Sequence, residues 1–276
     1  CIRDRMNTFR DNQDYEADMF VNNHEAKEIM DDNTLLVVVD TNKPSITQCE
    51  DLLYMAKMIV VLDHHRQGSD TIRNSVLSYI EPYASSASEM VAEILQYFTE
   101  GIRIRNVEAD SIYAGIMIDT DNFMQKTGVR TFEAAAFLRR CGADVTRVRK
   151  LFREDMNDYK ARGETIRNAE LFRGQFAISE CPSDYVDSPT VVGAQAANEL
   201  LNIVGVKASF VLTEYKGVIY ISARAIDEVN VQIIMERMGG GGHMNTAACQ
   251  MEGVGLVEAI GVLKNTIDDM LESGEI

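Results

Sequence analysis

The chain has 276 residues, of which 46% are hydrophobic and 25% charged, a balance typical of a soluble protein with one large or two medium domains. No run approaches the roughly 18 apolar residues of a membrane helix, and the first residues resemble neither a signal peptide nor a natural start, so we expect a piece of a longer protein. The formal net charge of -16 argues against duplex nucleic acid as a partner, because phosphate backbones are bound by basic surfaces.

The cysteines stand singly, with no CxxC pair among them: Cys1, Cys49, Cys141, Cys181 and Cys249. An odd number at irregular spacing indicates neither a disulfide framework nor a zinc knuckle. We therefore expect a protein domain of the reducing cytoplasm.

Two apolar runs follow a polar, acidic leader. TLLVVVD at residues 34–40 and KMIVVLD at residues 57–63 are rich in β-branched residues, and a helix-like segment at 51–56 lies between them. Continuous runs of this kind are typical of parallel strands buried on both faces. The order strand, helix, strand predicts a βαβ unit.

Helical patterns follow from residue 85, where Ser86 and Glu89 have the spacing of a capping box, and short alternating segments follow from about residue 171. The predicted fold class is α/β, with a parallel-sheet domain joined by a helical connector to a smaller mixed α/β domain. The expected boundaries are residues 1–140, 141–170 and 171–276.

Three aspartates each end an apolar run: Asp40, Asp63 and Asp119. Such a residue is often only a turn residue or a helix cap, but the carboxyl ends of parallel strands share one sheet edge, where ligands bind. His64 and His65 follow Asp63 directly and point in opposite directions on an extended segment, so one can bind a metal while the other has another role. Imidazole and carboxylates together predict a manganese or magnesium site.

A run of four glycines precedes His243 in the second domain. Glycine lets a backbone pass close to a ligand with its N–H groups outward, as anion binding requires, although a glycine run alone is more often a linker. His243 and Arg224 could add donors to a phosphate or an adenine edge. The candidate substrate-binding residues are Arg224, Gly240, Gly241, Gly242 and His243.

Together these motifs resemble the DHH phosphoesterase superfamily. The resemblance rests on DHH at residues 63–65, DTN at 40–42 and DTDNF at 119–123, and the glycine run is similar to the DHHA1 domain. EPYASSASE at 81–89, RTFEAAA at 130–136 and the segment 221–236 are similar to the cytoplasmic module of GdpP-type cyclic di-AMP phosphodiesterases.

The resemblance implies a manganese-dependent phosphodiesterase that opens cyclic di-AMP to pApA by two-metal activation of water. It implies that Asp40 bridges two Mn²⁺ ions and that His64 and Asp119 each complete the shell of one ion. His65 would face the substrate phosphate, and Asp63 would orient an imidazole. It also implies a parent protein anchored in a membrane, with this part in the cytoplasm.

One motif of the superfamily, a histidine followed by aspartates near the end of the first strand, has no counterpart before Asn33. We therefore expect the N-terminal strand and its ligands to be missing, so that this chain binds metal weakly or singly and hydrolyses poorly. An exposed sheet edge would favour a homodimer.

Other functions fit the same residues. An oligoribonuclease or a 3'-phosphoadenosine-phosphate phosphatase of the superfamily would share the two-domain plan, with a short oligoribonucleotide as a substrate. A catalytically silent nucleotide-binding module is an alternative of another class. An inorganic pyrophosphatase is disfavoured, because the sequence shows no basic cluster near its C-terminus.

Overall fold

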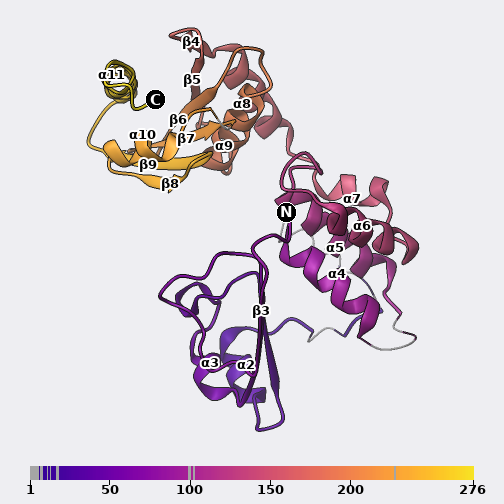
Figure 1. The fold of residues 1–276 in the computed structure, drawn as a ribbon. Coiled ribbons are helices and arrows are strands. Elements are labelled where there is room, and N and C mark those ends of the chain that lie inside the picture. Colours follow the sequence, from indigo (N-terminus) through magenta and orange to yellow (C-terminus); the bar gives the residue numbers. More distant parts are fainter. Residues whose placement is uncertain are drawn as a thin grey trace. The chain divides into compact units, whose positions relative to one another are not determined.

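The computed structural model describes residues 6, 9–10, 12, 14–16, 19–98, 101, 103–226 and 228–276. Cys1 lies outside these residues, as do several other positions before residue 19. The chain divides into two compact units, residues 1–153 and 154–276 (Figure 1). The division falls inside the expected connector, because helix α7 (Val145–Leu151) belongs to the first unit and α8 (Met156–Arg167) to the second.

The first unit contains a parallel three-stranded sheet in the order β1, β2, β3. Val37 pairs with Val60, and Val60 pairs with Leu77. The βαβ prediction is confirmed here, with the connecting helix shorter than a typical crossover. The elements of this part are α2 (Asn23–Ile29), β1 (Leu35–Val39), the 3₁₀ turn η1 (Pro44–Ile46), α3 (Asp51–Met55), β2 (Met58–Asp63) and β3 (Leu77–Ile80).

The two faces of this sheet differ in burial. One face packs into a small core with Leu53 and Ile72, and it consists of Val38, Ile59 and Val61. The other face exposes large apolar side chains, namely Leu35, Val37, Val39, Met58 and Leu77. The expectation that the first strand is buried on both faces is therefore wrong. An unbroken apolar run does not reveal how many faces of a strand the rest of the described chain covers.

Helices make up the rest of the first unit, and alanine-rich faces pack around Ala92, Ala109, Ala134 and Val148. They are α4 (Ala87–Tyr97), α5 (Asn106–Asp119), α6 (Val129–Arg140) and α7. Ser86 caps α4 by accepting a hydrogen bond from the Glu89 amide, as its spacing predicts.

The second unit is built on a six-stranded mixed sheet in the order β4-β5-β6-β7-β9-β8. Only β5 and β6 run parallel, and the other pairs are antiparallel. The prediction of a mixed α/β domain is confirmed. Its strands are β4 (Glu170–Phe172), β5 (Phe176–Cys181), β6 (Ala208–Tyr215), β7 (Val218–Ala225), β8 (Gly241–His243) and β9 (Thr246–Glu252).

Helices cover both faces of this sheet. Neighbouring residues of β6 point to opposite faces and therefore pack into different cores. Phe210 packs with Leu263 of α11 (Leu256–Glu272) and Ile234 of α10 (Val231–Arg237), whereas Val211 packs with Val192 of α9 (Pro189–Leu200). Among the described helices, none is both long and apolar enough to cross a membrane.

Candidate metal centre

The candidate site begins at the carboxyl ends of β1 and β2. Asp40 follows β1, and its amide donates to the Leu62 carbonyl at 3.0 Å, which continues the parallel ladder by one bond. Its backbone then turns into the left-handed region with φ 64°, a conformation that aspartate adopts more readily than most residues. Asp63 is the last residue of β2, and the paired histidines follow it.

Asp40, His64 and His65 each offer one ligand atom, and these atoms all lie within 4.8 Å of one another. His64 Nε2 lies 3.4 Å from Asp40 Oδ1, and His64 Nδ1 lies 3.4 Å from the Ala84 carbonyl oxygen. A ring whose Nδ1–H faces a carbonyl presents its Nε2 lone pair on the other side. Here the Nε2 lone pair of His64 would face the Asp40 carboxylate. Two groups that both offer lone pairs require a proton or a cation between them.

The charges of this cluster perturb one another. The hydrogen bond from His64 lowers the pKa of Asp40, although burial opposes this shift. The same bond raises the pKa of His64, with burial again opposing. Each shift favours the charged form of its group, which agrees with two side chains that need a positive charge between them.

Asp119 approaches the cluster from a helix. It ends an apolar run, as the sequence indicates, and this run is the last part of α5, so a helix and not a strand carries it. Burial, and then the charge of Asp40, raise the pKa of Asp119, which shows that the two carboxylates lie near each other. Its oxygens lie outside the group of three atoms that are within 4.8 Å.

The turn after Asp119 is strained. Asp121, Asn122 and Phe123 have φ values of 46°, 57° and 67°, three left-handed residues in succession. The buried Thr120 hydroxyl holds the turn by donating to the Ile116 carbonyl at 2.7 Å and accepting from the Phe123 amide at 3.0 Å. Such a conformation persists only where the surrounding contacts fix it.

Asp63 lies behind the cluster and is fully buried. Its Oδ1 accepts hydrogen bonds from His65 Nδ1 at 2.7 Å and from the His65 amide at 3.2 Å. Its Oδ2 accepts from Asn42 Nδ2 at 2.6 Å. Asn42 was not among the residues predicted from the sequence, although its place two residues after Asp40 in the DTN motif could have indicated a role.

In the second unit, the candidate substrate-binding residues lie on β7 and on or directly before β8, with β9 between these two strands. Arg224 of β7 pairs with Thr246 of β9, which in turn pairs with His243 of β8, so Arg224 and His243 lie on one face of the sheet. Burial lowers the pKa of Arg224, and among the described groups no carboxylate is a cause of that shift. A half-buried guanidinium of this kind is suited to an anionic ligand.

Two of the predicted glycines have a packing reason of their own. A Cβ on Gly240 would lie 2.2 Å from the Ala248 carbonyl oxygen, and one on Gly242 would lie 2.5 Å from Ala247 Cα. A Cβ on Gly241 would meet nothing within 4 Å. The run is therefore an ordered edge that packs closely on β9, and not a free linker.

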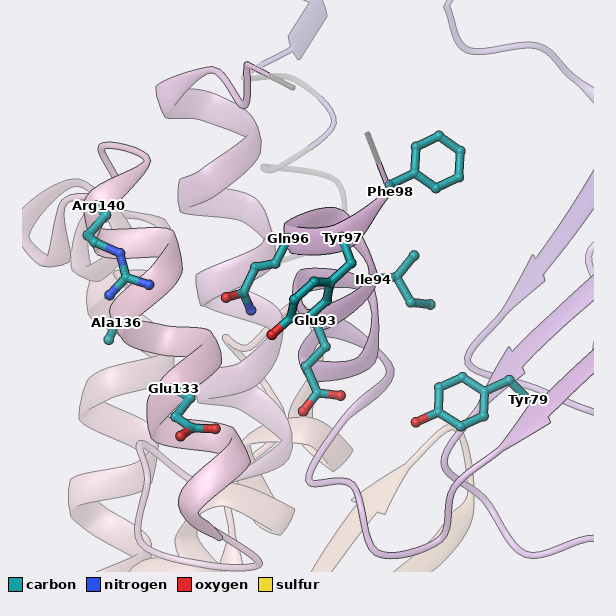
Figure 2. Close-up of a pocket in the computed structure, with 9 residues that line it drawn as sticks. All are labelled: Tyr79, Glu93, Ile94, Gln96, Tyr97, Phe98, Glu133, Ala136 and Arg140. Carbon is teal, nitrogen blue, oxygen red and sulfur yellow. The ribbon is translucent and has the colours of Figure 1, made fainter. Parts of the chain in front are cut away.

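The cavity described in the first unit lies apart from the predicted residues. A cavity of about 960 Å³ lies between β3 and helices α4 and α6, and Figure 2 shows Tyr79 on one side of it, opposite Glu93 and Tyr97. None of the residues that line it belongs to the Asp40–His64–His65 group. In the second unit a cavity of about 440 Å³ is lined in part by Gly240, Ser222 and Tyr220.

Comparison with known proteins places these features in a family. The model of the DHH family N-terminal domain matches residues 6–116, and that of the DHHA1 domain matches residues 175–273. The chain belongs to the DHH family. The resemblance seen in its motifs is thereby confirmed, and the two matches fall in the two compact units.

Several curated relatives are longer proteins. The chain is 44% identical over 259 residues to the cyclic-di-AMP phosphodiesterase GdpP of Bacillus subtilis, covering 92% of this chain and 39% of that protein. It is 41% identical over 244 residues to the cyclic-di-AMP phosphodiesterase PdeA of Listeria monocytogenes, covering 88% of this chain and 37% of that protein. The chain thus spans about two fifths of the length of these relatives.

A solved structure shares the fold. An exopolyphosphatase-related protein from Bacteroides fragilis matches with a TM-score of 0.76 at 22% sequence identity, over 90% of this chain and 74% of that chain. At this identity the likeness concerns the fold alone, and it agrees with the two-unit α/β architecture.

Proposed function

We propose that this DHH family chain is the catalytic part of a metal-dependent phosphodiesterase that hydrolyses cyclic di-AMP to pApA. The observation that carries the proposal is the convergence of Asp40, His64 and His65 within 4.8 Å, at the position of the family's DHH motif. The similarity to cyclic-di-AMP phosphodiesterases over about nine tenths of the chain supports the substrate.

The donor set fits a divalent cation. A carboxylate and an imidazole that face each other need positive charge between them, and their mixture of oxygen and nitrogen suits Mn²⁺. We propose Asp40 and His64 as ligands, with Asp119 as a further ligand. Of these proposed ligands, Asp40 and His64 belong to the cluster within 4.8 Å, so we expect this chain to bind metal weakly or singly.

A bound divalent ion would supply Lewis acidity, which activates water and offsets charge on phosphoryl oxygens. The protein side chains would bind and orient the substrate. His65 would face the substrate phosphate, and the buried Asp63 would hold that imidazole in place. In the second unit, Arg224, His243 and the edge formed by Gly240, Gly241 and Gly242 would bind the nucleotide.

The assembly is part of the proposal. The length of the relatives supports a larger parent protein, which we propose to be membrane-anchored with this part in the cytoplasm. The exposed edge of β1 supports a homodimer of the isolated chain.

The test is a comparison of substrates with and without Mn²⁺. Cyclic di-AMP, pApA and 3'-phosphoadenosine-phosphate are incubated with the chain, and the products are separated by chromatography. We expect manganese-dependent conversion of cyclic di-AMP to pApA as the fastest reaction. Faster loss of pApA or of the bisphosphate would favour the alternative superfamily activities, and nucleotide binding without turnover would favour a silent binding module.

A further inference from the structure

Asn42 is a buried residue for which the metal site alone gives no reason. Its side chain is only 2% exposed and lies between the two strand ends. Nδ2 donates to Asp63 Oδ2 at 2.6 Å and lies 3.4 Å from the His65 carbonyl oxygen. The amide orientation is fixed by chemistry, because the opposite flip would bring two acceptor oxygens together.

The other atom of the amide is left unpaired. Asn42 Oδ1 is buried and has no hydrogen-bond partner among the described residues. An unpaired buried acceptor is unfavourable, and an apolar residue of the same size would avoid it. The contribution of Asn42 therefore lies in its donor, which is directed at a single carboxylate.

That carboxylate controls the orientation of a histidine. Asp63 Oδ1 accepts from His65 Nδ1 at 2.7 Å, so the Nδ1–H tautomer is favoured and Nε2 is left as the ring nitrogen available to a ligand. A carboxylate held at one oxygen alone can rotate about its Cβ–Cγ bond. The donor on the second oxygen removes this freedom.

We propose that Asn42 is a positioning residue that locks the Asp63 carboxylate and thereby fixes the tautomer and direction of the His65 imidazole. The relay runs from Asn42 to Asp63 to His65. This inference rests on the proposed function for its effect on turnover, but its effect on the imidazole exists in the metal-free protein as well.

The first readout is the tautomer itself. Long-range ¹H–¹⁵N spectra of the metal-free chain are recorded at a pH of about 8, where an ordinary histidine is neutral. The chain has four histidines, so His65→Gln assigns the signal. We expect the Nδ1–H tautomer to predominate in the wild type and a mixture with the Nε2–H tautomer in Asn42→Leu, which keeps the volume and removes the donor. Asn42→His, whose Nδ1 stands at the same position along the side chain as Asn Nδ2, should restore the wild-type signal.

The second readout is turnover of cyclic di-AMP with Mn²⁺. We expect Asn42→Leu to lower kcat by about 10–100-fold, the range typical of residues that orient a metal site or catalytic group, with little change in KM. In an Asp63→Asn background the same substitution should add little, because both act through one carboxylate. Asn74→Leu is the matched control, since Asn74 Nδ2 also donates one bond, to the Leu53 carbonyl at 2.8 Å, outside the relay.

The outcomes separate the two proposals. A wild-type His65 tautomer in Asn42→Leu, with thermal unfolding confirming a folded chain, would overturn the relay whatever the activity. The relay would also be overturned if Asn42→Leu lowered kcat by the same factor in the Asp63→Asn background as in the wild type. If the wild-type chain hydrolyses none of the nucleotides, the proposed function fails, and the spectra still decide the role of Asn42.

Discussion

Single residues at the end of β1 combine strain with charge. Asp40 has a left-handed backbone and a carboxylate directed at His64. This conformation is unfavourable unless a neighbouring positive charge stabilises the carboxylate. Asp119 adds a second carboxylate whose pKa is raised by burial and by Asp40. The residue-scale chemistry therefore predicts cation binding.

Replacing Asp40 tests this directly. Asp40→Asn keeps the size of the side chain and removes the charge, and we expect Mn²⁺ affinity to fall by more than about 100-fold, since even outer partners of a metal site contribute 10–100-fold. Isothermal titration calorimetry measures the affinity. Asp70→Asn is the control, because Asp70 is exposed and accepts only from Ser45 Oγ at 3.1 Å among the described groups. Equal affinity in the wild type and Asp40→Asn would remove Asp40 from the site.

Thiol chemistry tests the burial of single side chains in the second unit. Burial raises the pKa of Cys249 to about 11, and the residue is 3% exposed. At a pH of about 8 it should remain a protonated, inaccessible thiol, and alkylation should leave it unmodified until denaturant is added. Mass spectrometry locates the label, and the partly exposed Cys49 serves as the reactive reference. Rapid labelling of Cys249 in the native chain would contradict its placement.

Among the elements, β8 depends on glycine for its contact with β9. Gly240→Ala would force a methyl group onto the Ala248 carbonyl, whereas Gly241→Ala meets open space. We expect the first substitution to lower the free energy of unfolding by about 1–3 kcal/mol and the second to change it by less than about 0.5 kcal/mol. Chemical denaturation of both variants measures the difference. Equal stabilities would mean that the edge does not pack as described.

The other exposed edge is β1, which pairs with β2 and with no other described strand. Its outward residue Val37 is 47% exposed, and the strand carries no charge that would oppose pairing with another chain. We expect self-association that Val37→Lys reduces, measured by sedimentation equilibrium. Val257→Lys, at an exposed position on α11, is the matched control. A wild-type chain that stays monomeric at all concentrations would contradict this expectation.

At the scale of the whole molecule, the hydrophobic cores do not cross from one unit to the other. In the described chain, two clusters lie within residues 1–153 and two within 154–276. Because a domain folds alone when it encloses its own core, residues 154–276 expressed separately should unfold cooperatively and give a dispersed NMR spectrum. A non-cooperative transition would show that the second unit needs the first.

The amino-acid pattern determined a large part of this protein. The alternation and continuity of apolar residues were enough to predict a parallel βαβ unit, helices, and a later mixed α/β unit, because strand and helix periods are local properties of the sequence. The DHH motif with Asp40 and Asp119 was enough to predict the family and a mixed carboxylate and imidazole cluster.

Only the tertiary structure decided how these pieces meet. Packing between distant segments decides three features. A helix end carries Asp119, one face of β1 stays exposed, and Asn42 reaches Asp63 across 21 positions of sequence. Local propensity does not encode such contacts, because side chains far apart in the chain become neighbours only after the strands have paired and the core has closed.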